Sequence, residues 1–202
     1  MKIEILYPEI CTLYGDKGNT MYLQKCLPDA EFVTTGLNEK PLFLKENIDM
    51  VYMCSMSEKS QELVLDRLMQ YKDEIAACMK DGKALFLLVG NSMELLGDYI
   101  KREDGTRVTG LGVVPGMYSV RQTPNRFNTL IKAKFNDMTL IGYTSRFAHT
   151  YGIPDDMTFC KVEIGQGSNP DTMNEGICKN RVIATYIHGP LLIQNPCLLY
   201  TS

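Results

Sequence analysis

The stretch LFLLVGNSMELLG, residues 85–97, limits the possible fold more than any other part of the sequence. Its opening apolar run is almost unbroken, which is typical of a strand buried on both faces of a parallel sheet. Gly90 ends this run, and the residues after it predict the beginning of a helix. This layout of strand, tight turn and helix is the one on which many α/β enzymes carry a nucleophile.

The first half of the chain alternates strand and helix patterns around this stretch. The segment 15–27 predicts a loop entering a helix with Asn19 or Thr20 as its cap, and the amphipathic spacing of 57–82 predicts one long helix closed by Gly82. This alternation predicts an α/β fold with an open, mostly parallel sheet flanked by helices, in a flavodoxin-like layering. The predicted strands are residues 2–8, 31–36, 48–55 and 83–89.

The second half has a different character, because strand patterns follow one another with only turns between them. They predict antiparallel strands that extend or flank the first sheet. No repeat or linker separates the two halves, and 202 residues fit one domain with a sizeable core. We therefore expect a single domain over residues 1–196.

Composition excludes several classes of function. The net charge is only −3 and tryptophan is absent, so a nucleic-acid partner is not favoured. The apolar runs are too short for membrane insertion and the N-terminus lacks a signal-peptide layout, which predicts a cytoplasmic protein. The seven cysteines form no CxxC pair, and His149 and His188 are the only histidines, so no metal or other cofactor is expected.

Candidate functional residues follow from strand ends, because open parallel sheets bind ligands at the carboxyl ends of their strands. Three turns are predicted to lie there, YGDKGN (14–19), MCSMSE (53–58) and GNSME (90–94), and a late strand ends in TYIHGPLL (185–192). The candidate binding residues are Asp16, Asn19, Cys54, Asn91 and Ser92, and the candidate catalytic residue is His188.

Five stretches between residues 6 and 196 carry a family resemblance: LYPEICTLYGDKGN, LLVGNSMELLG, GLGVVPG, KVEIGQGSN and NEGICKNRVIATYIHGPLLIQNP. They resemble the class I glutamine amidotransferases of the cobyric-acid-synthase (CobB/CobQ-like) type. In particular, they resemble the glutaminase subunit that partners a Mur-ligase-like synthetase in lipid II isoglutaminyl synthase, an enzyme of bacterial peptidoglycan synthesis. The resemblance implies a glutamine amidotransferase fold, glutamine as a ligand and a synthetase as partner.

The chain departs from that family at three turns. Family members attack glutamine with a cysteine, normally in a pattern such as CGGYQLLG, and aligning the shared LLG puts Gly90 at its position. Glycine cannot form the acyl-enzyme that a thiolate forms. Residues 53–56 replace the glycines expected after the third strand, and GYTSRFAHT (142–150) lacks the acid and the histidine of the corresponding family stretch. His188 remains as a vestigial base.

Other roles remain open for these residues. Cys54 is an alternative nucleophile on the neighbouring strand, whereas Ser92 is better explained as a helix cap. His188 either belongs to a vestigial site or only fixes its turn, and His149 is expected to pack rather than to catalyse. The YGDKGN turn either binds an anion or ligand carboxylate at a helix start or simply shapes the chain.

The leading functional hypothesis is an amidotransferase-like subunit that lacks glutaminase activity and binds a synthetase partner. One alternative is an active glutaminase that supplies ammonia through an unrecognised nucleophile, and another is a module that binds glutamine without hydrolysing it. A cobalamin-pathway amidotransferase domain is less favoured, because the resemblance implies fusion to a synthetase half that is absent here.

The last six residues, CLLYTS (197–202), resemble the translation of a transposon-end adapter used in sequencing libraries. The family resemblance implies a helical continuation after Pro196. We therefore expect that the natural sequence departs from this one after Pro196, and that Cys197 is not native.

Overall fold

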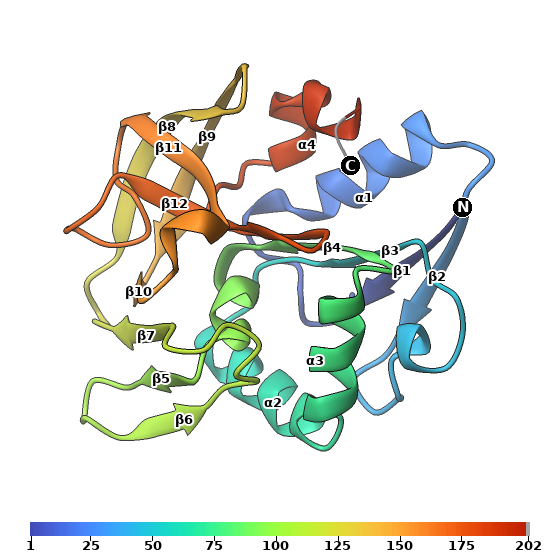
Figure 1. The fold of residues 1–202 in the computed structure, drawn as a ribbon, viewed down its shortest axis with the longest axis horizontal. Coiled ribbons are helices and arrows are strands. Elements are labelled where there is room, and N and C mark those ends of the chain that lie inside the picture. Colours follow the sequence, from blue (N-terminus) through green and yellow to red (C-terminus); the bar gives the residue numbers. More distant parts are fainter. Residues whose placement is uncertain (201–202) are drawn as a thin grey trace.

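Nine strands form one large sheet among residues 1–200, which the computed structural model describes (Figure 1). Their order is β2-β1-β3-β4-β13-β12-β11-β8-β9. The first five of these strands are parallel, and the other four join them in antiparallel pairs. The strands span Lys2–Leu6 (β1), Glu31–Thr35 (β2), Met50–Met53 (β3), Leu85–Val89 (β4), Phe127–Phe135 (β8), Met138–Arg146 (β9), Thr158–Ile164 (β11), Asn174–Lys179 (β12) and Val182–Thr185 (β13).

A smaller sheet has the strand order β10-β7-β5-β6. The sequence predicts that antiparallel strands of the second half extend or flank the first sheet, and both arrangements occur. Strands β8, β9, β11 and β12 extend the large sheet, while the smaller sheet flanks it (Figure 1). The smaller sheet consists of Tyr99–Lys101 (β5), Arg107–Thr109 (β6), Tyr118–Arg121 (β7) and Ala148–Tyr151 (β10).

Helices cover both faces of the large sheet (Figure 1). On one face lie α2 (Glu58–Met69) and α3 (Lys72–Asp81), and on the other lie α1 (Lys17–Cys26) and the short α4 (Leu191–Gln194). The expected α/β layering is therefore confirmed. Short 3₁₀ turns occupy Leu13–Gly15, Leu42–Leu44, Gly90–Leu96, Asp155–Met157 and Pro196–Tyr200. Residues 201 and 202 of the expected non-native tail lie outside the described residues.

The prediction of one long helix over 57–82 is wrong, because the chain breaks between α2 and α3. The two pieces have different neighbours, since α2 contacts the turn Gly90–Leu96 and α3 contacts the turn Leu42–Leu44. The break lets each piece turn its own apolar face to its own neighbour. Gly82 does end α3 in the left-handed conformation, with φ of 62°, as the sequence predicts.

The predicted cap of α1 is also wrong. The helix begins at Lys17, before Asn19 and Thr20, and no side chain caps it. Asn19 is buried inside the helix, where its amide donates to the Tyr52 hydroxyl (3.0 Å) and its side-chain oxygen accepts the Leu192 N–H (2.8 Å). Asn19 therefore ties α1 to β3 and α4, and these buried partners decide its place in the fold.

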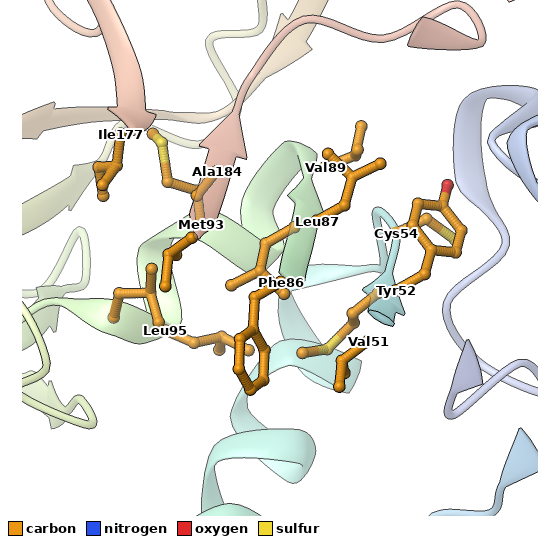
Figure 2. Close-up of a cluster of buried hydrophobic side chains, with 14 of the residues drawn as sticks. Val51, Tyr52, Cys54, Phe86, Leu87, Val89, Met93, Leu95, Ile177 and Ala184 are labelled. Atoms are coloured by element: carbon orange, nitrogen blue, oxygen red, sulfur yellow. The ribbon is translucent and has the colours of Figure 1, made fainter. Parts of the chain in front are cut away.

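The apolar run before Gly90 forms β4, and all five of its residues are buried. Figure 2 shows Phe86, Leu87 and Val89 of this strand among buried side chains of β3, the Gly90–Leu96 turn, β12 and β13. β4 pairs in parallel with β3 on one side and with β13 on the other. The prediction of a strand buried on both faces is confirmed, and the turn that follows it is anchored in the core.

Candidate functional site

The turn after β4 has the backbone of a nucleophile-bearing turn but no side chain to act as nucleophile. Gly90 is buried and has φ of 72°, in the left-handed region that favours glycine. A Cβ built on Gly90 would overlap the hydroxyl oxygen of Ser55 and would lie 3.2 Å from Cε1 of His188. A side chain at position 90 would therefore point at the histidine that the family resemblance identifies as the base.

Polar residues of this turn hold it against the loop after β3. The predicted helix is a 3₁₀ turn, Gly90–Leu96, and the Ser92 hydroxyl donates to the carbonyl of Val89 (2.8 Å). The predicted capping role of Ser92 is therefore wrong, because its hydroxyl bonds a carbonyl of the preceding strand instead of a helix N–H. Asn91 pairs with both backbone groups of Met56, accepting its N–H (3.0 Å) and donating to its carbonyl (2.8 Å).

Replacing Asn91 with alanine is expected to lower the free energy of unfolding by about 2–3 kcal/mol, because it leaves two buried backbone groups of Met56 without partners. Urea denaturation measures this loss. Asn128→Ala, at an exposed position of β8, is the matched control and is expected to change stability by less than about 0.5 kcal/mol. Equal effects of the two substitutions would contradict the structural role of Asn91.

Ser55 is the residue at this site that the sequence analysis missed. It follows β3 in the loop that also carries Cys54, and its buried hydroxyl lies 3.0 Å from Oδ2 of Asp16 and 3.2 Å from Nδ1 of His188. The same hydroxyl lies 3.4 Å from the carbonyl of Val89. Ser55 therefore lies between Asp16, Gly90 and His188.

His188 is held as a neutral proton donor toward Ser55. Its backbone pairs with Tyr143 in an isolated bridge, and its Nε2 accepts the backbone N–H of Ser145 (3.1 Å). The proton of the neutral ring therefore lies on Nδ1, the atom that faces Ser55. Burial lowers the pKa of His188 to about 4, so the ring is uncharged at neutral pH.

Asp16 is a buried carboxyl at the start of α1. Its Oδ2 accepts the Ser55 hydroxyl and lies 3.9 Å from Nδ1 of His188, while its Oδ1 has no hydrogen-bond partner among the described residues. Burial raises the pKa of Asp16 to about 7, although the hydrogen bond from Ser55 opposes this. Hydrogen bonds therefore run from His188 through Ser55 to Asp16.

A second buried carboxyl supports the turn from the opposite side. Glu94 accepts the amide of Gln61 (3.0 Å) and the hydroxyl of Tyr186 (2.9 Å), and burial raises its pKa. The same Gln61 amide donates to the Asn91 carbonyl (2.6 Å), and Arg121 donates to the Gln61 side-chain oxygen (2.8 Å). This network connects the turn after β4 to α2 and to the smaller sheet.

Cys54 and His149 stand apart from the group around Ser55. The Cys54 thiol donates to the carbonyl of Cys11 (2.5 Å), and burial raises its pKa to about 12, so it is protonated at neutral pH. His149 packs against Phe127, with ring centroids 4.0 Å apart, and burial lowers its pKa to about 4. The structure thus brings Asp16 together with His188 and Gly90, and leaves Cys54, Asn19, Asn91 and Ser92 with structural partners.

Aromatic rings pack beside the buried histidine. The ring centroids of Tyr14 and Tyr143 lie 4.7 Å and 5.3 Å from that of His188. Asp16, Ser55 and His188 are each no more than 1% exposed. Solvent therefore does not reach these three side chains in this structure.

Other site types have little support in residues 1–200. That part of the chain holds no group of three or more side chains suited to a metal ion, and no helix of the length and apolarity that a membrane crossing requires. All seven cysteines are free, and Cys11, Cys54 and Cys160 are buried.

The buried parallel strand, the left-handed turn at its end and the histidine directed at that turn agree with the arrangement that the resemblance to the glutamine amidotransferases implies. Residues 2–196 match the model of the CobB/CobQ-like glutamine amidotransferase domain, and the chain belongs to this family.

Two relatives are similar over most of the chain. Subunit GatD of lipid II isoglutaminyl synthase (glutamine-hydrolyzing) from Streptococcus pneumoniae (strain ATCC BAA-255 / R6) is 28% identical, over 99% of this chain and 78% of its own. The subunit of the same name from Staphylococcus aureus (strain N315) is 25% identical, over 91% of this chain and 74% of its own.

Solved structures show the same fold. A crystal structure of a glutamine amidotransferase superposes with a TM-score of 0.64 at 13% identity, covering 98% of this chain and 95% of its own. PurLQS from Thermotoga maritima superposes with a TM-score of 0.62 at 11% identity, covering 93% of this chain and 86% of its own.

Proposed function

We propose that this chain is an amidotransferase-like subunit that binds a Mur-ligase-like synthetase in the bacterial cytoplasm and does not hydrolyse glutamine itself. The subunit role is supported by two relatives that are subunits of a lipid II isoglutaminyl synthase. The observation that carries the loss of chemistry is at position 90, where no side chain is present and the Ser55 hydroxyl fills the space of one. The subunit and its synthetase would together amidate peptidoglycan precursors.

Ser55 does not replace the missing thiol as a nucleophile in this proposal. A serine must give its proton to a base as it attacks a carbonyl carbon. His188 already uses its Nε2 lone pair for the Ser145 N–H and carries its proton on Nδ1, so it cannot be that base. The Ser55 hydroxyl donates to Asp16 instead, but Ser55 is buried, so a glutamine carbonyl does not reach its oxygen in this structure. Cys54 is no better placed, because burial keeps its thiol protonated.

Ammonia release and partner binding test this function together. Homogeneous protein, alone and with a Mur-ligase-like synthetase of the same genome, is expected to release ammonia from glutamine at least about 10⁴-fold more slowly than an active enzyme. It is expected to co-purify with that synthetase. The Streptococcus pneumoniae subunit, whose name describes a glutamine-hydrolysing enzyme, is the positive control for activity.

Each alternative function has its own outcome in this experiment. Steady conversion of glutamine to glutamate would refute the proposal and favour an active glutaminase. Calorimetric binding of glutamine without ammonia release would favour a glutamine-binding module. Failure to co-purify with the synthetase would remove the subunit role.

A further inference from the structure

We infer that Ser55 and Gly90 form a reciprocal pair, in which the side chain at position 55 closes the site and leaves no room for any side chain at position 90. This inference rests on the proposed loss of glutaminase chemistry and names the residue that keeps the site closed. Loss of a thiol alone would leave an empty space beside His188, and here Ser55 fills that space.

Steric exclusion is the first argument for the pair. A Cβ at position 90 would overlap the Ser55 hydroxyl oxygen and lie 2.9 Å from the Ser55 Cβ, closer than non-bonded carbon atoms pack. Ser55 cannot easily move aside, because it is buried and its hydroxyl bonds Asp16. Removing only the hydroxyl would leave the second overlap in place.

Hydrogen bonding is the second argument. Nδ1 of His188 donates to the Ser55 hydroxyl, and the Ser55 hydroxyl donates to Oδ2 of Asp16. One buried hydroxyl therefore satisfies a donor and an acceptor that would otherwise lack partners. Ser55 thus both fills the space beside Gly90 and accepts the Nδ1 proton of His188, which a small apolar residue would not do.

The pair determines which side chains position 90 can accept. A cysteine placed at position 90 meets the same overlaps as an alanine, since both begin with a Cβ. Reintroducing a thiol at the turn therefore requires glycine at position 55 as a second change. Even then, a side chain at position 90 carries the strain of a left-handed backbone, and its Cβ lies 3.2 Å from Cε1 of His188, which must shift slightly.

A double-mutant cycle on thermal stability tests the pair. Gly90→Ala is expected to lower Tm by more than about 10 °C or to prevent folding, because a clash adds to the left-handed backbone strain. Gly90→Ala combined with Ser55→Gly is expected to recover to within about 5 °C of Ser55→Gly alone. If Gly90→Ala does not fold, recovery of folded protein by the second substitution is the same positive result.

Two control variants separate the steric overlap from the backbone strain. Gly105→Ala has the same backbone strain, with φ of 84°, but its Cβ would meet nothing within 4 Å, so we expect a loss of only about 4 °C. Ser55→Ala combined with Gly90→Ala keeps the Cβ overlap and is expected to recover only partly. Equal losses for Gly90→Ala and Gly105→Ala, or no recovery by Ser55→Gly, would overturn the inference whatever the glutaminase assay shows.

Nitrogen-15 NMR of histidine tests the hydrogen-bonding role separately from packing. The chain has two histidines, so His149→Gln leaves the His188 signal alone. In the otherwise unchanged protein, the proton is expected on Nδ1 down to about pH 4. In Ser55→Gly, Asp16 becomes the direct neighbour of Nδ1, and the His188 titration is expected to move to higher pH. The tautomer is expected to stay the same, because the Ser145 N–H still bonds Nε2. An unchanged titration would contradict the role assigned to Ser55.

Discussion

Replacing Asp16 with asparagine is expected to stabilise the protein by about 2–4 kcal/mol at neutral and alkaline pH, and to have little effect near pH 4. The carboxyl is buried, and its Oδ1 has no hydrogen-bond partner among the described residues. Asparagine keeps an oxygen that accepts the Ser55 hydroxyl and carries no charge. The substitution therefore removes the cost of burying an ionised group.

The sign of this effect follows from the pKa of Asp16 in the two states. The carboxyl titrates near 3.8 in the unfolded chain and near 7 in the folded protein. Stability associated with the protonated carboxyl is therefore fully present below about pH 4, and is lost as the pH rises through about 7. The shift corresponds to about 4 kcal/mol, from which the cost of burying the asparagine NH2 group at the unpartnered Oδ1 position is subtracted.

Urea unfolding of both proteins between about pH 4 and about pH 8 measures the difference directly. His188 lies 3.9 Å from the Asp16 carboxyl, and its low pKa confines its own titration to the acid end of this range. The Tyr52 hydroxyl donates to the Asp16 carbonyl (3.0 Å), and burial raises its pKa well above this range. Asp66→Asn, which removes a carboxyl from an exposed position of α2, is the control. A difference for Asp16→Asn that does not vary with pH would contradict the burial of an ionisable carboxyl here.

The central strand and its turn could be predicted from the sequence because their signals are local. A run such as KALFLLV has few stable environments other than the middle of a parallel sheet, and it forms β4. Gly82 and Gly90 mark positions where the backbone becomes left-handed, which glycine tolerates best. The absence of a nucleophile at position 90 also follows from the sequence, given the family resemblance.

The group around Ser55 could not be predicted, because its members are distant in the chain. Ser55 and His188 are 133 residues apart and meet only because β13 pairs beside β4. Cys54 is the alternative nucleophile that the sequence offers because of its thiol, but no local pattern indicates which of two adjacent loop residues faces the turn. A glycine at an expected nucleophile position together with serine in place of an expected glycine was the available signal, and it becomes meaningful only once the two turns are known to meet.

Polar residues at the predicted turns were harder to interpret than apolar ones. Asn19, Asn91 and Ser92 lie at strand ends or helix starts, which is where ligands bind, yet all three are buried with protein partners. The sequence shows that a residue can form hydrogen bonds, but it does not show which groups the residue bonds. Their binding roles therefore stay predictions, while their structural contacts are established by the fold.

Replacing Glu62 with glutamine is expected to lower the free energy of unfolding by about 2 kcal/mol at pH 7. The carboxylate oxygens of Glu62 accept hydrogen bonds from Arg102 (2.8 Å) and from the buried Arg121 (2.5 Å). The hydrogen bond from Arg102 is the main reason that the pKa of Glu62 falls to about 2. That shift alone corresponds to about 3 kcal/mol, and we reduce it because the side chain of Glu62 is 29% exposed. Glutamine leaves the positive charge of Arg121 without its neighbouring carboxylate.

The pH dependence of the Glu62 effect runs opposite to that of Asp16. A carboxyl whose pKa is lowered on folding contributes stability above its unfolded pKa of 4.5, and that contribution is lost as the pH falls toward about 2. The difference between Glu62→Gln and the unchanged protein should therefore shrink below about pH 4. Urea unfolding across this range is the measurement, and Glu163→Gln, which breaks the exposed pair with Lys132, is the control expected to have a much smaller effect.

Loss of the ion pairs of Glu62 is also expected to make the turn after β4 less stable. Arg121 orients Gln61, and Gln61 donates both to the Asn91 carbonyl and to Glu94. Amide hydrogen exchange of the Gly90–Leu96 turn is therefore expected to accelerate in Glu62→Gln but not in Glu163→Gln. Equal exchange in the two variants would mean that the turn is held by β4 and the core alone, and that the ion pair only joins α2 to the smaller sheet.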